Sequence, residues 1–161
     1  MRNGNLFKLD VSCAEALAPL IAGFRVELKS YKGISAEEDL QSATDEALEF
    51  FEAGFPVYVY EEDGCYLGYL VCRIDGAVWV EHIYVMPQHR GRGIADLLYD
   101  AAERLAVPDA PYNWVHPNND AMIRFLAKKG HDTLNLIEIR KRREGEVLCE
   151  KIGIFGNEFE Y

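Results

Sequence analysis

Residues 81–95 read EHIYVMPQHRGRGIA, and this stretch decides the fold because it joins a strand, a turn and a helix. An apolar run typical of a strand leads into a turn that contains Gly91 and Gly93. The helix that follows is indicated by apolar residues three and four positions apart, and Pro108 ends it. These positions are Ile94, Leu97, Leu98, Ala101, Ala102 and Leu105. A helix that begins at glycines offers unpaired N–H groups and a favourable dipole, so the stretch predicts an anion site.

Upstream of this stretch the sequence predicts an antiparallel meander. Three runs rich in Val, Tyr, Ile and Trp are separated by the dipeptides at 63–64 and 75–76, both Asp-Gly. Asp-Gly between apolar runs is a strong hairpin signal. The expected strands are 55–60, 66–73 and 77–85. Before them we expect a strand at 4–10, a helix at 12–29 and a second helix that ends before Gly54. A capping box of Ser35 and Glu38 is expected to open that second helix.

Downstream, the pattern predicts a strand at 112–115, a helix that ends at Gly130, and two last strands at 133–140 and 150–155. Trp79, Trp114 and Phe125 are expected in the core. The order of elements is that of an α/β protein with a mixed central sheet, an antiparallel meander and flanking helices.

Composition narrows the class of protein. The chain has 161 residues, of which 49% are hydrophobic and 27% charged, so one domain over 1–161 with a sizeable core is expected. Its net charge of −10 argues against nucleic acid as a partner and suits a cationic substrate. No apolar run is long enough to span a bilayer, and the four scattered cysteines have no metal-ligand spacing. We expect a cytoplasmic protein with no membrane partner and no metal.

The anion is not identified by the common nucleotide motifs. A Walker A loop needs Gly-Lys-Ser/Thr, which is absent, and the Rossmann fingerprint fails because Asp96 stands where its last glycine belongs. The segment instead resembles the GNAT superfamily of acyl-CoA-dependent N-acyltransferases, whose signature Arg/Gln-x-x-Gly-x-Gly/Ala is present as QHRGRG at 88–93. A second family hallmark, Asn followed eleven residues later by a helix-ending Gly, is present as Asn119 and Gly130. The resemblance covers residues 4–156.

This resemblance implies the GNAT fold, acetyl-CoA as co-substrate and a set of cofactor-binding residues. Main-chain groups of Ile83, Tyr84 and Val85 would pair with pantetheine where two strands splay apart, and Asn119 would lie nearby. The N-terminal helices would form a wall of the acceptor pocket, and Arg25 and Glu27 are candidates to line it. The amides that would cradle the pyrophosphate belong to Arg90, Gly91, Arg92, Gly93, Ile94, Ala95 and Asp96. The arginine side chains are expected to attract the phosphates by charge.

Glu81 is the catalytic candidate. It lies four residues before Val85, a position that in the family often carries the base or a substrate-binding acid, and the two-residue period puts it on the face of Ile83 and Val85. The alternative is an exposed carboxylate without a role. His82 should point to the other face, where a structural role is favoured.

The chain departs from the family pattern at Leu126, seven residues after Asn119, where a Tyr customarily protonates the leaving thiolate. Either the thiolate leaves unassisted, or a hydroxyl of Tyr31, Tyr99 or Tyr112 serves. The sequence therefore predicts an N-acetyltransferase that moves acetyl from acetyl-CoA to a primary amine of a small cationic molecule by direct attack. The alternatives are acetylation of a protein N-terminus or lysine, and an acyl-CoA-binding regulatory module without turnover. A homodimer is possible.

Overall fold

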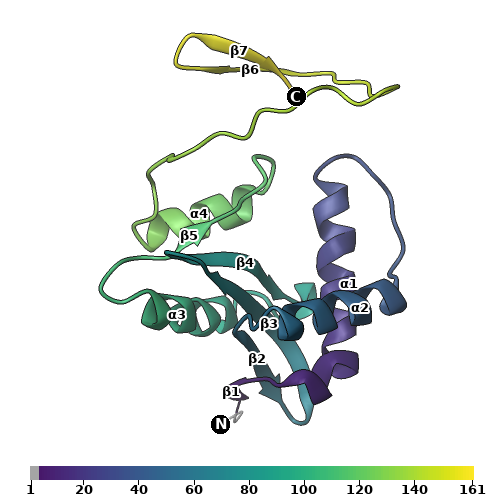
Figure 1. Cartoon of the computed structure of the whole chain (residues 1–161), viewed down its shortest axis with the longest axis vertical. Coiled ribbons are helices and arrows are strands. Elements are labelled where there is room, and N and C mark those ends of the chain that lie inside the picture. Colours follow the sequence, from purple (N-terminus) through teal and green to yellow (C-terminus); the bar gives the residue numbers. More distant parts are fainter. Residues whose placement is uncertain (1–3) are drawn as a thin grey trace. The chain divides into compact units, whose positions relative to one another are not determined.

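The computed structural model describes residues 4–161, which form two compact units divided between Phe125 and Leu126. Each unit is treated by itself. The first contains the sheet and all elements of the predicted site up to the start of the last helix (Figure 1). That residues 1–161 act as a single domain stays a prediction.

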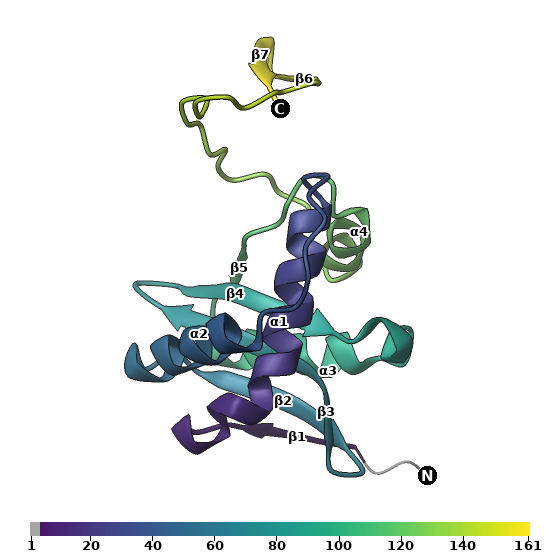
Figure 2. The same cartoon turned by 90° about the vertical axis from the view of Figure 1, so that its right-hand side faces the viewer.

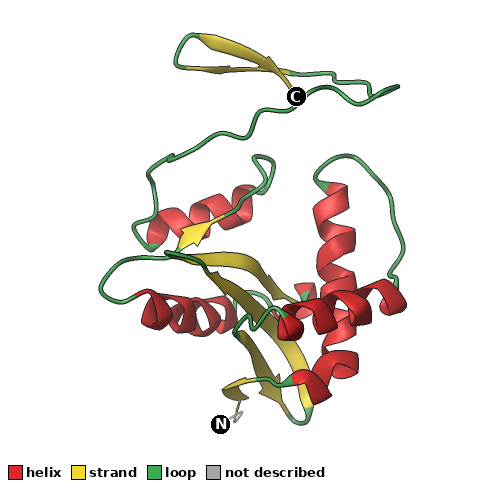
Figure 3. Ribbon diagram, in the orientation of Figure 1, coloured by secondary structure: helices red, strands yellow, loops and turns green. Residues whose placement is uncertain are grey.

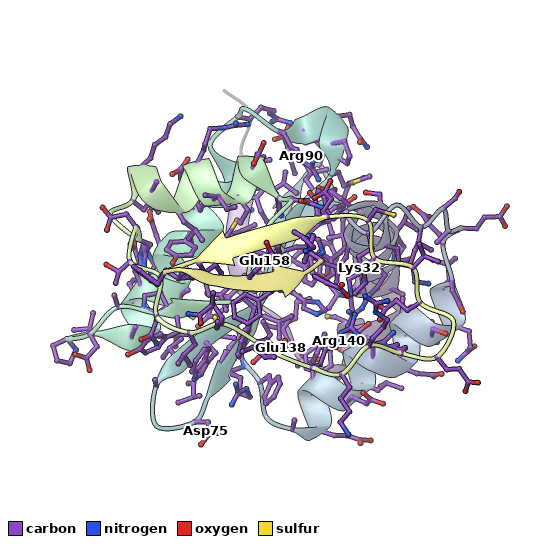
Figure 4. The ribbon with its side chains drawn as sticks, turned by 90° about the horizontal axis from the view of Figure 1, so that it is seen from above. Lys32, Asp75, Arg90, Glu138, Arg140 and Glu158 are labelled. Atoms are coloured by element: carbon purple, nitrogen blue, oxygen red, sulfur yellow. The ribbon has the colours of Figure 1, made fainter. Side chains whose placement is uncertain are left out.

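The sheet of the first unit confirms the predicted meander. Its strands are β1 (Gly4–Lys8), β2 (Val57–Glu62), β3 (Cys65–Ile74), β4 (Val78–Val85) and β5 (Tyr112–Asn113), and they lie in that order. All neighbours are antiparallel except β4 and β5, which are parallel. Asp63 and Gly64 both have positive φ, at 52° and 77°, which is the geometry of the tight hairpin turn that Asp-Gly favours. Asp75 lies at the tip of the next hairpin (Figure 4).

Helices cover both faces of this sheet. The helices are α1 (Ala14–Ser30), α2 (Leu40–Glu52), α3 (Ile94–Ala106) and α4 (Asp120–Lys128). Alternate residues of β3 separate the two faces: Tyr69 and Val71 belong to the core under α1 and α2, whereas a Cβ built on Gly68 would contact Leu98 of α3. Figures 1 and 2 show α3 on one side of the sheet and the α1–α2 pair on the other.

The predicted start of the second helix is wrong. The capping box of Ser35 and Glu38 does not form, and α2 begins at Leu40 instead. Asp39 is the N-cap, because its carboxylate accepts hydrogen bonds from the backbone N–H (3.0 Å) and the hydroxyl (2.7 Å) of Ser42. An Asp directly before the apolar face caps that helix without the four-residue box.

The second unit differs from the expected pair of strands. The strand predicted at 133–140 is wrong, since those residues have no regular structure (Figure 3). In an extended strand, Leu134 and Leu136 would lie on one face, and Ile137 and Ile139 on the other. The segment therefore has no single apolar face to bury, and all four side chains are exposed. The second expected strand is present as β6 (Lys151–Ile154), and it pairs with β7 (Asn157–Glu160), which the sequence analysis missed.

Candidate active site

The sheet splits at Glu81. Strand β5 pairs with β4 only at Trp79 and Val80, opposite Tyr112 and Asn113. From Glu81 to Val85, the edge of β4 that faces β5 has no strand partner among residues 4–161. This stretch includes Ile83, Tyr84 and Val85, and Figure 3 shows how short β5 is beside β4. Because the Met86 N–H donates to Leu67 on β3, the alternation of an antiparallel pair turns the backbone groups of Tyr84 to β3 and those of Ile83 and Val85 to the open edge. Backbone groups of β4 along this edge therefore remain available to an extended ligand that adds to the sheet like a strand, except the Val85 carbonyl oxygen, which accepts a hydrogen bond from Nε of Arg90.

A β-bulge interrupts β4 at Glu81. His82 lies opposite Val71 and Val80 lies opposite Cys72, which leaves Glu81 without a partner on β3. The Glu81 carboxylate instead accepts a hydrogen bond from Nε of Arg73 at 2.7 Å. Bulges of this kind redirect side chains next to sites.

The bulge corrects the face predicted for Glu81. Arg73 is two residues from Val71, so both lie on the α1–α2 face, whereas Ile83 is opposite Leu70 on the face of α3. Because Glu81 contacts Arg73, its carboxylate is directed to the α1–α2 face and not to that of Ile83. The alternation of side chains between the two faces of the sheet is broken here because the unpaired Glu81 shifts it by one residue.

His82 is part of a buried polar cluster. Its side chain is only 7% exposed, its Nδ1 lies 2.9 Å from the Tyr69 hydroxyl, and its Nε2 lies 3.5 Å from a Glu46 carboxylate oxygen and from a nitrogen of Arg25. Burial, with the nearby Arg25 charge, lowers the pKa of His82 to about 3. The imidazole is therefore neutral, and it joins α1, α2 and the sheet. Arg25 is ion-paired with Glu46. This ion pair explains the position of the Arg25 side chain without a role in binding the acceptor substrate.

The glycine loop at the end of β4 has the geometry of an anion cradle. Gly91 and Gly93 have φ of 73° and 80°, in the left-handed region, and a Cβ built on either would meet nothing within 4 Å. The glycines are thus required by backbone conformation and not by crowding. Gly93 is the N-cap of α3 and supplies no side-chain cap. The first-turn N–H groups, those of residues 94–96, have no acceptor within the helix. The loop fits a phosphate group.

The two arginine side chains of the loop are turned back onto the protein, contrary to the expectation that their charge faces an anion. Arg90 donates to the carbonyl oxygen of Val85 (2.8 Å) and is ion-paired with Glu27 of α1. Arg92 is ion-paired with Glu62 of β2, whose side chain is 7% exposed. Because each guanidinium is already matched by a carboxylate, the anion-attracting groups of this loop are its backbone amides.

Asn119 serves as a helix cap in this structure. Its side-chain oxygen accepts a hydrogen bond from the N–H of Met122 (3.1 Å), and its carbonyl accepts from Ile123 (3.0 Å), so it begins α4. The position of Asn119 beside pantetheine stays a prediction. Leu126, at the family's customary tyrosine position, is buried.

The three candidate tyrosines differ in their surroundings. The Tyr99 hydroxyl exchanges hydrogen bonds with Asn113, and burial raises the pKa of Tyr99 to about 12. The Tyr31 hydroxyl donates to Glu27 at 2.6 Å, and burial together with that bond raises the pKa of Tyr31 to about 12. Tyr112 stacks on Trp79 and is exposed. Two of the three phenols are therefore weaker acids than an ordinary tyrosine.

The loop after α1 contacts the segment that follows β5. The Tyr31 ring, just past the end of α1, stacks on His116 with centroids 5.8 Å apart. The Asn118 side-chain amide donates to the Tyr31 carbonyl at 3.0 Å. These contacts tie the α1–α2 loop to the segment between β5 and α4. A separate pocket of about 200 Å³ lies between α1 and α2 and includes Arg25 and Glu46, but no residue of β4 or of the glycine loop lines it.

Trp79 and Trp114 correct the expectation of a core position. Both rings belong to a group of stacked aromatic side chains on β4, on β5 and directly after β5, and the Trp114 side chain is 53% exposed. Arg73, which holds Glu81, places its guanidinium 5.5 Å from the centre of the Trp79 ring. Sequence reasoning missed Arg73, because the bulge pairs it with Trp79 and brings it to Glu81 only through its long side chain.

Comparison with known proteins agrees with this geometry. The family model described as acetyltransferase (GNAT) family matches residues 23–131. The chain belongs to this family and is an acyltransferase. No curated protein matches the chain.

Solved structures share the fold at low sequence identity. A possible acetyltransferase from Clostridium difficile 630 is 13% identical with a TM-score of 0.68, over 87% of this chain and 99% of that one. The aminoglycoside N-acetyltransferase AAC(6′)-Iy in complex with CoA is 15% identical with a TM-score of 0.69, over 89% and 97%. A ribosomal-protein-alanine N-acetyltransferase from Brucella melitensis biovar Abortus 2308 is 19% identical with a TM-score of 0.66, over 88% and 99%. At these identities the likeness shows the fold alone.

Among residues 4–161, no group of three or more His, Cys, Asp and Glu side chains gathers as a metal site. Within the same range, none of the helices has the length and apolar character needed to cross a bilayer. The cytoplasmic location stays a prediction.

Proposed function

We propose that the protein transfers the acetyl group of acetyl-CoA to a primary amine of a small cationic molecule, by direct attack of the amine on the thioester. One observation carries this proposal: the edge of β4 opens at Glu81, β4 ends four residues later at Val85, and a short turn then leads to the glycine loop at the start of α3. A cofactor with a phosphate end and an extended amide arm fits this order of groups. The co-substrate supplies an acetyl group activated as a thioester.

The residues proposed to hold the co-substrate follow from that order. Backbone amides from Arg90 to Asp96 bind the pyrophosphate, and the β4 edge at residues 83–85 pairs with the pantetheine arm. The neighbouring AAC(6′)-Iy structure, which is a complex with CoA, supports acetyl-CoA as co-substrate. The backbone N–H groups of the open edge are also the donors available to stabilise the oxyanion.

Glu81 is the proposed base, because it stands where the sheet opens. Its Oε1 is held by Arg73, while its Oε2 has no hydrogen-bond partner among residues 4–161. That second oxygen can accept the amine proton directly or through water. The net charge of −10 favours a cationic acceptor.

The leaving thiolate needs no phenol in this proposal. A thiol has an ordinary pKa near 8.5, about three units below the pKa of about 12 held by Tyr31 and Tyr99. Proton transfer from either phenol to the thiolate is therefore uphill. The thiolate leaves unassisted and takes its proton from solvent.

The contact between Tyr31 and residues 116–118 favours a small acceptor over a polypeptide. It ties the α1–α2 loop to the segment between β5 and α4, and we expect this tie to restrict access for a polypeptide. Acetylation of a protein N-terminus or lysine is the alternative, and the ribosomal-protein enzyme among the structural neighbours shares only the fold.

The test of the base is Glu81→Gln, with Asp75→Asn as matched control. Asp75 also contacts Arg73, at 3.1 Å, but is exposed at the hairpin tip. The kcat/KM of Glu81→Gln at neutral pH should fall roughly 10²- to 10⁴-fold while acetyl-CoA affinity stays, and high pH should partly restore it. Asp75→Asn should keep wild-type kinetics. A rise in KM alone would make Glu81 a binding acid, and unchanged kinetics would remove it from the site.

A second candidate function, an acyl-CoA-binding module without turnover, is favoured by Leu126 in place of the customary tyrosine. Radiolabelled acetyl-CoA incubated with a broad amine panel separates the two. Transfer to any amine excludes the module, whereas CoA binding without transfer to any of them excludes the enzyme.

A further inference from the structure

Both tryptophans of the chain lie in one surface stack. The ring centroids of Trp79 and Tyr112 are 4.8 Å apart with an interplanar angle of 26°, and those of Trp79 and Trp114 are 5.0 Å apart at 18°. We call these three residues the aromatic stack. Trp114 is 53% and Tyr112 43% exposed.

The stack is fixed by the backbone. Trp79 of β4 lies directly opposite Tyr112 of β5 in the parallel register, and Trp114 follows two residues later, so side chains of both strands project from one face of the sheet. Rings held in this way lose little conformational freedom when a ligand binds. Nearly parallel stacked rings that remain partly exposed offer apolar ring faces and edges to a ligand, and an exposed apolar surface commonly marks a binding site.

Charge beside the stack selects the kind of ligand. Arg73 sits 5.5 Å from the Trp79 ring centre and binds the Glu81 carboxylate at 2.7 Å, so a cation, a ring and a carboxylate already coexist here. Glu81 follows Trp79 by two residues, about 6.6 Å along the strand. A ligand whose ring lies on the stack can therefore direct an ammonium or amine group toward Glu81.

We propose that the aromatic stack binds the ring of the acceptor, and that the substrate is a primary amine carried on a sugar or aromatic ring. This inference rests on the proposed function, since it places the acceptor beside the open edge of β4. The ring's apolar face stacks on Trp114 or Tyr112, while its amine points along the sheet to Glu81. A flexible aliphatic diamine has no face to stack and lacks this contact.

The binding test uses the protein's own fluorescence, because Trp79 and Trp114 are its only tryptophans. Glucosamine, 2-deoxystreptamine and benzylamine are titrated against putrescine, without acetyl-CoA. At least one ring amine should change the tryptophan emission saturably, and putrescine should not at equal concentration. Equal responses to all four, or none, would overturn the proposal. Acrylamide should quench the emission of the free protein and lose access when the ring amine binds. Emission already protected in the free protein would mean that another segment covers the stack, and would also overturn it.

Variants assign the effect to the ring. Trp114→Leu keeps apolar bulk and leaves Trp79 as reporter, and it should raise the ring amine's Kd roughly 3- to 30-fold. Trp114→Phe should restore most of the affinity. Leu97→Ala, at a similarly exposed apolar position on α3 (45%), should leave the ring amine's Kd unchanged.

The two proposals fail in different ways. If ring amines bind through Trp114 but no acetyl is transferred, the proposed function is wrong, whereas the proposal that the aromatic stack binds a ring amine is still supported. If acetyl is transferred to ring amines and to putrescine alike, and Trp114→Leu has wild-type KM for both, the stack is not the acceptor site.

Discussion

Replacing Gly93 by alanine tests the backbone cradle directly. Gly93 has φ of 80°, and a non-glycine residue in the left-handed region costs about 1–2 kcal/mol. A Cβ there meets nothing within 4 Å, so the penalty is conformational and not steric. We expect the loop of the unbound Gly93→Ala protein to leave this conformation and so remove the strain. Binding CoA then requires the strained conformation again, so Kd should rise about 5- to 30-fold.

Gly64 provides the matched control for this variant. It has φ of 77° in the β2–β3 turn, and a Cβ there also meets nothing within 4 Å. Gly64→Ala carries the same conformational penalty without touching the loop, so its CoA affinity should equal that of wild type. Isothermal calorimetry with CoA at constant salt, together with urea unfolding of each protein, gives both quantities. If Gly93→Ala binds CoA as tightly as Gly64→Ala does, the amides of this loop do not hold the pyrophosphate.

Two other predictions concern charges that the structure pairs or buries. Arg92→Gln removes a cation that is ion-paired with the buried Glu62, so urea unfolding should show a loss of about 1–3 kcal/mol, while the calorimetric Kd for CoA changes less than about threefold. A tenfold weaker Kd at unchanged stability would return Arg92 to the phosphates. His82 stays neutral down to a pKa of about 3, whereas in the unfolded chain it takes up a proton below about pH 6.5. Protonation thus favours unfolding, and stability is lost as pH falls from about 6.5 toward 3, by roughly 1 kcal/mol per pH unit. His82→Gln should lack this part of the slope between pH 7 and 4, and parallel unfolding curves for the two proteins would contradict the burial argument.

Local chemistry explains which elements could be predicted. The Asp-Gly turns define the meander because their positive φ angles are encoded by the dipeptide itself. Helix α3 was predictable because its apolar spacing repeats over several turns and the glycines fix its start. The strand at 133–140 was not, because its apolar residues change phase between Leu136 and Ile137, and a strand forms only against a partner edge.

The candidate site divides in the same way. By itself, the sequence determined the glycine loop, the strand before it and the helix after it, because the conformation of each depends on neighbours within a few residues. Only the tertiary structure decided where the side chains point. The bulge at Glu81, the Arg73 contact and the aromatic stack each join residues on different strands, and one inserted position in the register reverses a face. The ion pairs of Arg90 and Arg92 were hidden for the same reason, since their carboxylate partners lie 63 and 30 residues away in the chain.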